Sequence, residues 1–164
     1  GKTVAVAGGG NAGFEAAISL ANYVKKIYIL EYGPKVKADI QNQARAKKTG
    51  KVEVLTNVVL KKVQGQDFLD SIVYQDRQSK TLKTLKVRGI FVEIGSQPAT
   101  SFVKGLVVFN EKDEIVVNPK TGETSTPGLF SAGDADDVPY KQIVIAAGEG
   151  AKAALSVANY LQKL

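Results

Sequence analysis

Two hydrophobic patterns alternate along the N-terminal part of the chain: short apolar runs, and segments whose apolar residues recur every three or four positions. The run KTVAVAG, residues 2–8, is rich in β-branched residues and stops at three glycines, as buried strands of parallel sheets do. Over residues 11–24, alanine, leucine and valine fall on one side of a helix. KIYILE, residues 26–31, has the pattern of a second strand. This order predicts a βαβ unit with a right-handed crossover.

The pattern after this unit predicts one more helix, an antiparallel meander and two further strands. The dipeptide Gly33-Pro34 breaks the chain, and a polar helix is expected over residues 38–47. Turns near Gly65 and Ser79 separate the runs of the meander. The expected strands are KVEVLTN (51–57), VVLKKVQGQ (58–66), FLDSIVYQD (68–76), TLKTLKV (81–87) and GIFVEIG (89–95).

A Gln-Pro step at residues 97–98 marks the expected domain boundary. The elements expected beyond it are short strands, a turn over residues 118–128, a strand LFSAGDA over 129–135, and a long alanine-rich helix from Tyr140 to Leu161. The pattern therefore predicts an α/β protein, with a Rossmann-like domain over residues 1–97 and a second segment over residues 98–164.

The motif Gly8-x-Gly10-x-x-Gly13 lies where the first predicted strand passes into the first helix. Gly8 permits a tight turn, Gly10 lets a pyrophosphate approach the backbone, and Gly13 lets the helix pack closely on the sheet. Asn11 and Ala12 complete the loop at the helix N-terminus, where free N–H groups and the helix dipole favour an anion. We therefore predict that this loop binds a dinucleotide. A tight turn that binds nothing is the alternative.

Glu31 ends the second predicted strand, about 20 residues after the loop, where an acid binds the adenosine ribose hydroxyls of a dinucleotide. A carboxylate there repels the 2′-phosphate of NADP, and the segment LEYGPKVK contains no arginine that would reverse this preference. We therefore expect NADH rather than NADPH, with Lys35 and Lys37 softening the preference. Tyr32 is a candidate to flank the adenine, and an exposed tyrosine at a strand end is the alternative.

The composition excludes several kinds of chemistry. Because the chain contains no Cys, His or Trp, it holds no disulfide, no Cys/His zinc site and no Ser-His or Cys-His nucleophile pair. We identify no catalytic and no metal-binding residue. The absence of Met and the start at Gly1 indicate a piece of a longer protein. No apolar run has membrane-spanning length and no signal-peptide pattern is present, so we expect no membrane association.

The net charge of +6 comes from lysines scattered along the chain. It predicts a solvated basic surface, with attraction for an anionic cofactor or an acidic partner as the alternative. A nucleic-acid binder is disfavoured, because no recognised motif accompanies the charge.

Four segments resemble, in the same order, the low-molecular-weight thioredoxin reductase family. The resemblance covers nearly the whole chain and is greatest for the branch formed by the alkyl hydroperoxide reductase flavoproteins, whose partner is a peroxiredoxin. NADPH-dependent thioredoxin reductases carry a basic pair after the second strand. This chain has Glu31 and Tyr32 there, which favours the NADH-using branch. The segments are GKTVAVAGGGNAGFEAAISLA, LEYGPKVKAD, GIFVEIGSQPAT and TPGLFSAGDADDVPYKQIVIAAGEGAKAA.

The resemblance implies an NAD domain over residues 1–97, inserted into an FAD domain made of two separated segments. Residues 98–164 would be the second FAD segment. The first FAD segment and a redox Cys-x-x-Cys just before the first strand would lie outside this chain. The complete protein is implied to be a cytoplasmic homodimer.

Site residues are also implied by the resemblance. Gly95 would lie against the NAD, and the Asp134 carboxylate would bind the ribityl chain of FAD. An aspartate that merely ends a strand in a turn is the alternative for Asp134. The residues implied at the flavin are Gly133 and Asp134, together with Lys141, Gln142 and Ile143 at the start of the final helix.

Four residues near this implied flavin site are given structural roles only. Asp136 and Asp137 are expected to face solvent. Gly148 and Gly150 are expected to allow close packing of the final helix.

The complete protein is thereby expected to be an NADH-dependent flavin disulfide reductase, acting in peroxide defence. Electrons would pass from NADH through FAD and the Cys-x-x-Cys to a thioredoxin- or peroxiredoxin-type disulfide. The chain alone would bind the nucleotide and be inactive. The alternatives are an NAD(P)H-binding module without catalysis and a ferredoxin–NADP reductase-like flavoprotein. Two cysteines spaced by two residues just upstream would support the disulfide reductase, and their absence would favour the ferredoxin–NADP reductase-like enzyme.

Overall fold

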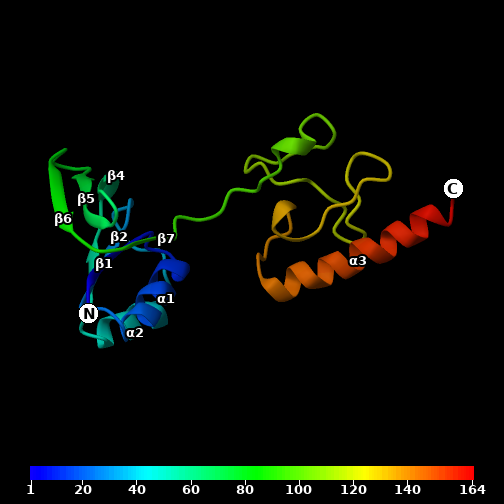
Figure 1. Cartoon of the computed structure of the whole chain (residues 1–164). Coiled ribbons are helices and arrows are strands. Elements are labelled where there is room, and N and C mark those ends of the chain that lie inside the picture. Colours follow the sequence, from blue (N-terminus) through cyan, green and yellow to red (C-terminus); the bar gives the residue numbers. More distant parts are fainter. The chain divides into compact units, whose positions relative to one another are not determined.

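The structure is a computed structural model that describes residues 1–164. It consists of two compact units, Gly1–Gly95 and Ser96–Leu164 (Figure 1). The boundary between the units falls next to the Gln-Pro step. The assignment of nucleotide and flavin roles to the two parts stays a prediction.

The first unit is built on a four-stranded parallel sheet with the strand order β3-β2-β1-β7. In this register Val6 of β1 lies opposite Ile29 of β2 on one side and opposite Phe91 of β7 on the other. The strands are β1 (Thr3–Ala7), β2 (Lys26–Leu30), β3 (Val52–Leu55) and β7 (Ile90–Val92). Because all four run parallel, their carboxyl ends share one edge, where open α/β sheets bind ligands.

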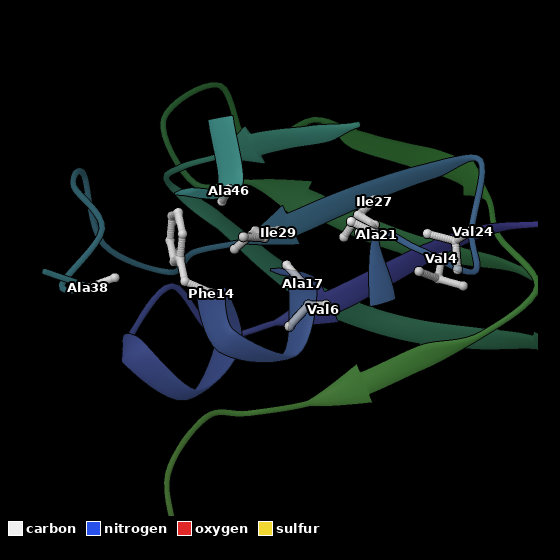
Figure 2. Packing of buried hydrophobic residues seen from close by; sticks show 10 residues of the cluster. All are labelled: Val4, Val6, Phe14, Ala17, Ala21, Val24, Ile27, Ile29, Ala38 and Ala46. Carbon is white, nitrogen blue, oxygen red and sulfur yellow. The ribbon is translucent and has the colours of Figure 1, made fainter. Parts of the chain in front are cut away.

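Two helices, α1 (Asn11–Leu20) and α2 (Ile40–Lys48), cover one face of this sheet. Side chains alternate along β1, so that Val4 and Val6 face the helices and belong to one buried cluster with Phe14 of α1, in which Val4 lies near Val24 (Figure 2). The buried cluster consists of Val4, Val6, Phe14, Ala17, Ala21, Val24, Ile27, Ile29, Ala38 and Ala46.

An antiparallel sheet covers the opposite face. Its strands β4 (Val58–Gly65), β5 (Leu69–Asp76) and β6 (Leu82–Lys86) lie in the order β4-β5-β6. Ala5 and Leu30 of the parallel sheet share a buried cluster with Val58, Ile72 and Val87. The first unit therefore has three layers, and the predicted α/β fold with a parallel sheet and an antiparallel meander is confirmed.

Both helices of this unit differ at one end from the sequence-based expectation. α1 ends at Leu20 rather than near residue 24, because Tyr23 N–H donates to Leu20 O and Lys25 N–H already donates to Lys2 O beside β1. α2 begins at Ile40 rather than at residue 38, because the Asp39 carboxylate caps the helix by accepting from the backbone N–H of Asn42 at 2.6 Å.

The second unit contains one long helix, α3 (Ile143–Leu161), and two short 3₁₀ turns, η1 (Ser101–Val103) and η2 (Gly133–Ala135). Its small buried cluster consists of Val103, Ile115 and Val117. None of the helices α1, α2 and α3 combines the length and the hydrophobicity that a membrane-spanning helix needs.

The strand predicted over residues 129–135 is wrong, as are the other short strands predicted in this part. Only isolated bridges form here, including one between Glu123 and Phe130. Gly133, at φ +82°, turns the backbone into η2 and ends the extended run. The final helix starts at Ile143 rather than at Tyr140, because Gln142 is still extended, with φ −134°.

Candidate dinucleotide-binding site

The glycine loop connects β1 to α1 at the carboxyl edge of the parallel sheet. Gly8 has φ +120°, and a Cβ atom on it would lie 2.1 Å from the backbone oxygen of Glu93. A Cβ atom on Gly13 would lie 2.0 Å from Gly8 O, so the loop and the first turn of α1 are in direct backbone contact. Only glycine fits at either position, which agrees with the turn and packing roles expected of them.

Gly10 faces open space instead. A Cβ atom there would meet nothing within 4 Å. Gly10 is also the N-cap of α1, and no side chain caps this helix end. The first turn of α1 therefore presents backbone N–H groups without a side-chain acceptor, an arrangement that favours an anion.

Glu31, directly after β2, is buried, with 8% of its surface exposed. Its Oε2 accepts from Gly9 N–H at 2.9 Å, and its Oε1 accepts from Gly33 N–H at 2.6 Å. Both carboxylate oxygens are thus fixed by backbone donors, and each keeps a further lone pair for another donor. A Cβ atom on Gly9 would lie 2.6 Å from Glu31 Oε2, so the carboxylate needs a glycine there. Sequence reasoning missed Gly9, although the unbroken run of three glycines is a visible signal.

The loop, Glu31 and the end of β7 surround a cavity of about 770 Å³. Among the residues predicted to bind the nucleotide, Gly8, Gly10, Asn11, Ala12, Glu31, Tyr32 and Gly95 line it, whereas Gly13 does not. Lining residues that sequence reasoning missed include Val59 and Leu60 of β4, because nothing local to the glycine loop shows which face the antiparallel sheet covers.

An arginine from outside the loop also reaches this region. The Arg77 guanidinium carbon lies 3.6 Å from the centroid of the Tyr32 ring, and Arg77 Nη1 donates to Tyr32 O at 2.9 Å. The segment LEYGPKVK contains no arginine, but the fold supplies one from the end of β5. No signal in the local sequence identifies this pair.

The residues implied at the flavin all lie in the second unit. Asp134 is exposed in η2, and Gly133 donates its N–H to Oε2 of the buried Glu149 at 2.9 Å. Sequence reasoning gave Glu149 no role. Gln142 is the N-cap of α3, no side chain caps this end, and Ile143 follows it with 91% of its surface exposed.

The Lys141 side chain is already occupied within this unit. Its Nζ donates to Asp136 O and lies 3.3 Å from Glu114 Oε1. The side-chain amide of Asn110 and this ammonium lower the pKa of the Glu114 carboxyl.

Asp136 was expected to face solvent, and this prediction is wrong. Its exposed fraction is 1%, because it pairs with Ile115 beside the small core of the unit and accepts from Val138 N–H at 3.2 Å. Burial, with the nearby charge of Glu149, raises the pKa of the Asp136 carboxyl. Asp137 is half-buried, and its Oδ1 accepts from Val117 N–H at 3.2 Å.

The close packing expected at Gly148 and Gly150 is not seen. A Cβ atom on either glycine would meet nothing within 4 Å.

The parallel sheet, the glycine loop and the buried acid after β2 define a Rossmann-type α/β domain. Residues 1–150 match the family model of the pyridine nucleotide-disulphide oxidoreductases, and the chain belongs to this family.

Curated relatives match the chain nearly from end to end. The F subunit of alkyl hydroperoxide reductase in Pseudomonas aeruginosa is 48% identical over 162 residues, which cover 98% of this chain and 31% of that protein. A protein named NADH dehydrogenase from Bacillus subtilis is 45% identical over 161 residues, with the same coverage of both chains. The chain thus spans about a third of the length of the curated relatives it matches.

Solved structures of thioredoxin reductases share the fold of this chain. Thioredoxin reductase of Lactococcus lactis matches with a TM-score of 0.87 and 28% identity, over 99% of this chain and 54% of that one. Thioredoxin reductase of T. acidophilum matches with a TM-score of 0.84 and 36% identity, over 99% and 53% of the two chains.

Proposed function

We propose that the first unit binds NADH and that the complete protein is an FAD-dependent disulfide oxidoreductase. Glu31 carries this proposal, because its carboxylate is buried at the nucleotide cavity with both oxygens held in place by backbone N–H groups. The remaining lone pairs would accept from the two ribose hydroxyls of the adenosine half. The pyrophosphate would lie at the uncapped N-terminus of α1, next to the open face of Gly10.

The preference for NADH follows from charge. A 2′-phosphate on the ribose would meet the Glu31 carboxylate, and like charges at close range repel. Lys37 lines the same cavity and Lys35 lies close by in the sequence, so the preference would be moderated rather than absolute.

The second unit would supply part of the flavin site. The uncapped N-terminus of α3 would face the flavin, and the Gly133–Glu149 hydrogen bond would fix the loop that carries Asp134. Lys141 would contribute backbone only, because its ammonium group is paired. FAD, when bound, accepts a hydride from NADH and passes electrons to a disulfide.

The downstream partner would be a thioredoxin- or peroxiredoxin-type disulfide, and the complete protein a cytoplasmic homodimer. Relatives that carry the name alkyl hydroperoxide reductase and solved thioredoxin reductases support a partner of this kind. This chain holds no cysteine, so by itself it would act as a nucleotide-binding module.

Calorimetric titration of the chain with NADH and with NADPH tests the proposal. We expect tighter binding of NADH, and a Kd for NADH that rises at least about 10–100-fold in Glu31→Ala, since the loss of even one hydrogen bond to a charged group costs about 1.5–3 kcal/mol. Glu31→Gln removes the repulsion and should narrow the difference between NADH and NADPH.

Glu53→Ala is the matched control, because this glutamate makes only an exposed ion pair with Lys26 on the neighbouring strand. It should leave both Kd values unchanged. Tighter binding of NADPH by the unmodified chain would contradict the cofactor assignment. No change on Glu31→Ala would contradict the role of Glu31.

A further inference from the structure

We propose that Arg77 is a positioning residue that holds Tyr32 as a platform for the adenine base. The proposal rests on the proposed nucleotide site and adds to it a residue from the antiparallel layer. The observation behind it is the pair itself, in which the guanidinium lies 3.6 Å from the ring centroid. At this distance a cation over an aromatic face is attracted by the ring quadrupole, and a planar guanidinium can stack on the ring.

The two members of the pair have different relations to the cavity. Tyr32 lines it and has 58% of its surface exposed, whereas Arg77 does not line it. In the proposed arrangement Arg77 lies on the ring face away from the cavity, and the rest of the ring is left for the base. Tyr32 directly follows Glu31, which would hold the adenosine ribose. The base attached to that ribose would thus lie within reach of the open side of the ring.

Hydrogen bonds fix the position of Arg77. Its backbone N–H donates to Asn57 O at 2.7 Å, and Asn57 N–H donates to Gly33 O at 2.9 Å. Arg77 Nη1 donates in turn to Tyr32 O at 2.9 Å. The arginine is therefore tied to the turn after β2 at two main-chain oxygens, directly at Tyr32 O and through Asn57 at Gly33 O.

The turn that follows Arg77 is also well ordered by local bonds. Asp76 Oδ1 accepts from the backbone N–H groups of Gln78 and Ser79, at 2.9 and 3.0 Å. These bonds lower the pKa of the Asp76 carboxyl, so both hydrogen bonds to the ionised carboxylate are present at neutral pH. A positioning residue needs such support, because a mobile guanidinium would leave the ring free to rotate.

This arrangement assigns Arg77 a role in affinity but not in choosing between cofactors. A residue behind the ring would improve the binding of every adenine nucleotide alike. A residue that met the 2′-phosphate would improve only the binding of NADPH. The two roles are distinguished by the Kd values for NADH, NADPH and ADP-ribose.

Titrations of the full chain with these three ligands test the proposal. We expect Tyr32→Ala to weaken NADH and ADP-ribose about tenfold, within the range that base–aromatic stacking contributes. Arg77→Gln should weaken the binding of NADH, NADPH and ADP-ribose by a similar factor of about five, as expected for the loss of one cation–π contact at an exposed site. Tyr32→Phe and Arg77→Lys should recover part of the loss, the first because it keeps the ring and the second because it keeps the charge.

The fluorescence of 1,N6-etheno-ADP-ribose changes when its base stacks on an aromatic ring, and a residue that only maintains the fold would not affect this change. We expect the fluorescence change on binding to be lost in Tyr32→Ala and reduced in Arg77→Gln. Arg88→Gln is the matched control, because this exposed arginine pairs with Asp70 and does not line the nucleotide cavity.

A loss confined to NADPH in Arg77→Gln would overturn the proposal and make Arg77 a reader of the 2′-phosphate. Unchanged binding of all three ligands in both Arg77→Gln and Tyr32→Ala would overturn it as well, while leaving the nucleotide site intact. Failure of the unmodified chain to bind any of the three would instead overturn the proposed function on which the role of Arg77 rests.

Discussion

Single residues in this chain show how far local sequence specifies a site. Gly8, Gly10 and Glu31 were identified because their roles depend on neighbours in the chain: a tight turn, an open backbone and the end of a strand. Arg77 could not be identified in this way, because it lies 45 residues beyond Tyr32, and the fold alone brings the two together. Asp136 was misplaced for the same reason, since its burial depends on packing against Ile115.

The raised pKa of Asp136 makes a prediction at this scale. Because the pKa of Asp136 is higher in the folded chain than in the unfolded chain, protonation of this carboxyl stabilises the folded state. This stabilisation of the fold is complete below the unfolded pKa, and it is lost as pH rises through the folded pKa. Glu149 and Asp137 oppose the ionised form, and Lys141 favours it. Asp136→Asn does not titrate. We therefore expect protection of α3 amides in this variant to increase relative to the unmodified chain as pH rises above about 4, the ordinary pKa of an aspartate.

Amide hydrogen exchange of the Asp136→Asn variant and of the unmodified chain, compared at each pH, measures this difference in protection. Glu111→Gln, an exposed acid of the same unit, serves as the control and should show none. A pH-independent difference between Asp136→Asn and the unmodified chain would contradict the argument.

At the scale of elements, the hydrophobic pattern predicted the helices and strands of the first unit. It failed in the second unit, where the formation of a strand depends on a neighbouring strand to pair with. All elements of the first unit were predicted, with helix ends displaced by a few residues through a cap at Asp39 and a turn after Leu20. The apolar run at residues 129–135 has strand-like composition. It makes no ladder, because a strand exists only beside another strand and the backbone turns at Gly133.

Glycines in different elements should respond to alanine in opposite directions. Gly8→Ala places a Cβ atom against a backbone carbonyl at a positive φ, and should lower the free energy of unfolding by about 2–4 kcal/mol. In Gly148→Ala the added Cβ atom meets open space on α3, so the free energy of unfolding of the second unit should rise by about 0.5–1 kcal/mol through helix propensity. Denaturant unfolding monitored by circular dichroism measures both. A lower free energy of unfolding in Gly148→Ala would contradict the open space seen around this glycine.

At the scale of the whole molecule, the two units differ in the amount of core they bury. The first has two clusters between three layers, whereas the second has a cluster of three residues and a helix with exposed apolar side chains, among them Ile143, Val144 and Leu155. A small core leaves less apolar burial to offset chain entropy. Sequence pattern indicated the boundary between the parts, but it could not show how little of the second part is covered.

We therefore expect the second unit to open more readily than the first. Native-state hydrogen exchange should show weak protection over residues 96–164 and strong protection over β1, β2 and α1. Uniform protection along the chain would contradict this expectation.

The paired hydrogen bonds of Glu31 also determine how quickly the cavity could be filled. Because the backbone N–H groups of Gly9 and Gly33 hold both carboxylate oxygens, the chain itself fixes the acid, and no loop has to fold when a ligand arrives. Association would then be a single encounter step, whose observed rate rises linearly with ligand concentration and shows no plateau. The chain would bind its ligand as a rigid receptor, and differences in affinity among nucleotides would lie in their dissociation rates.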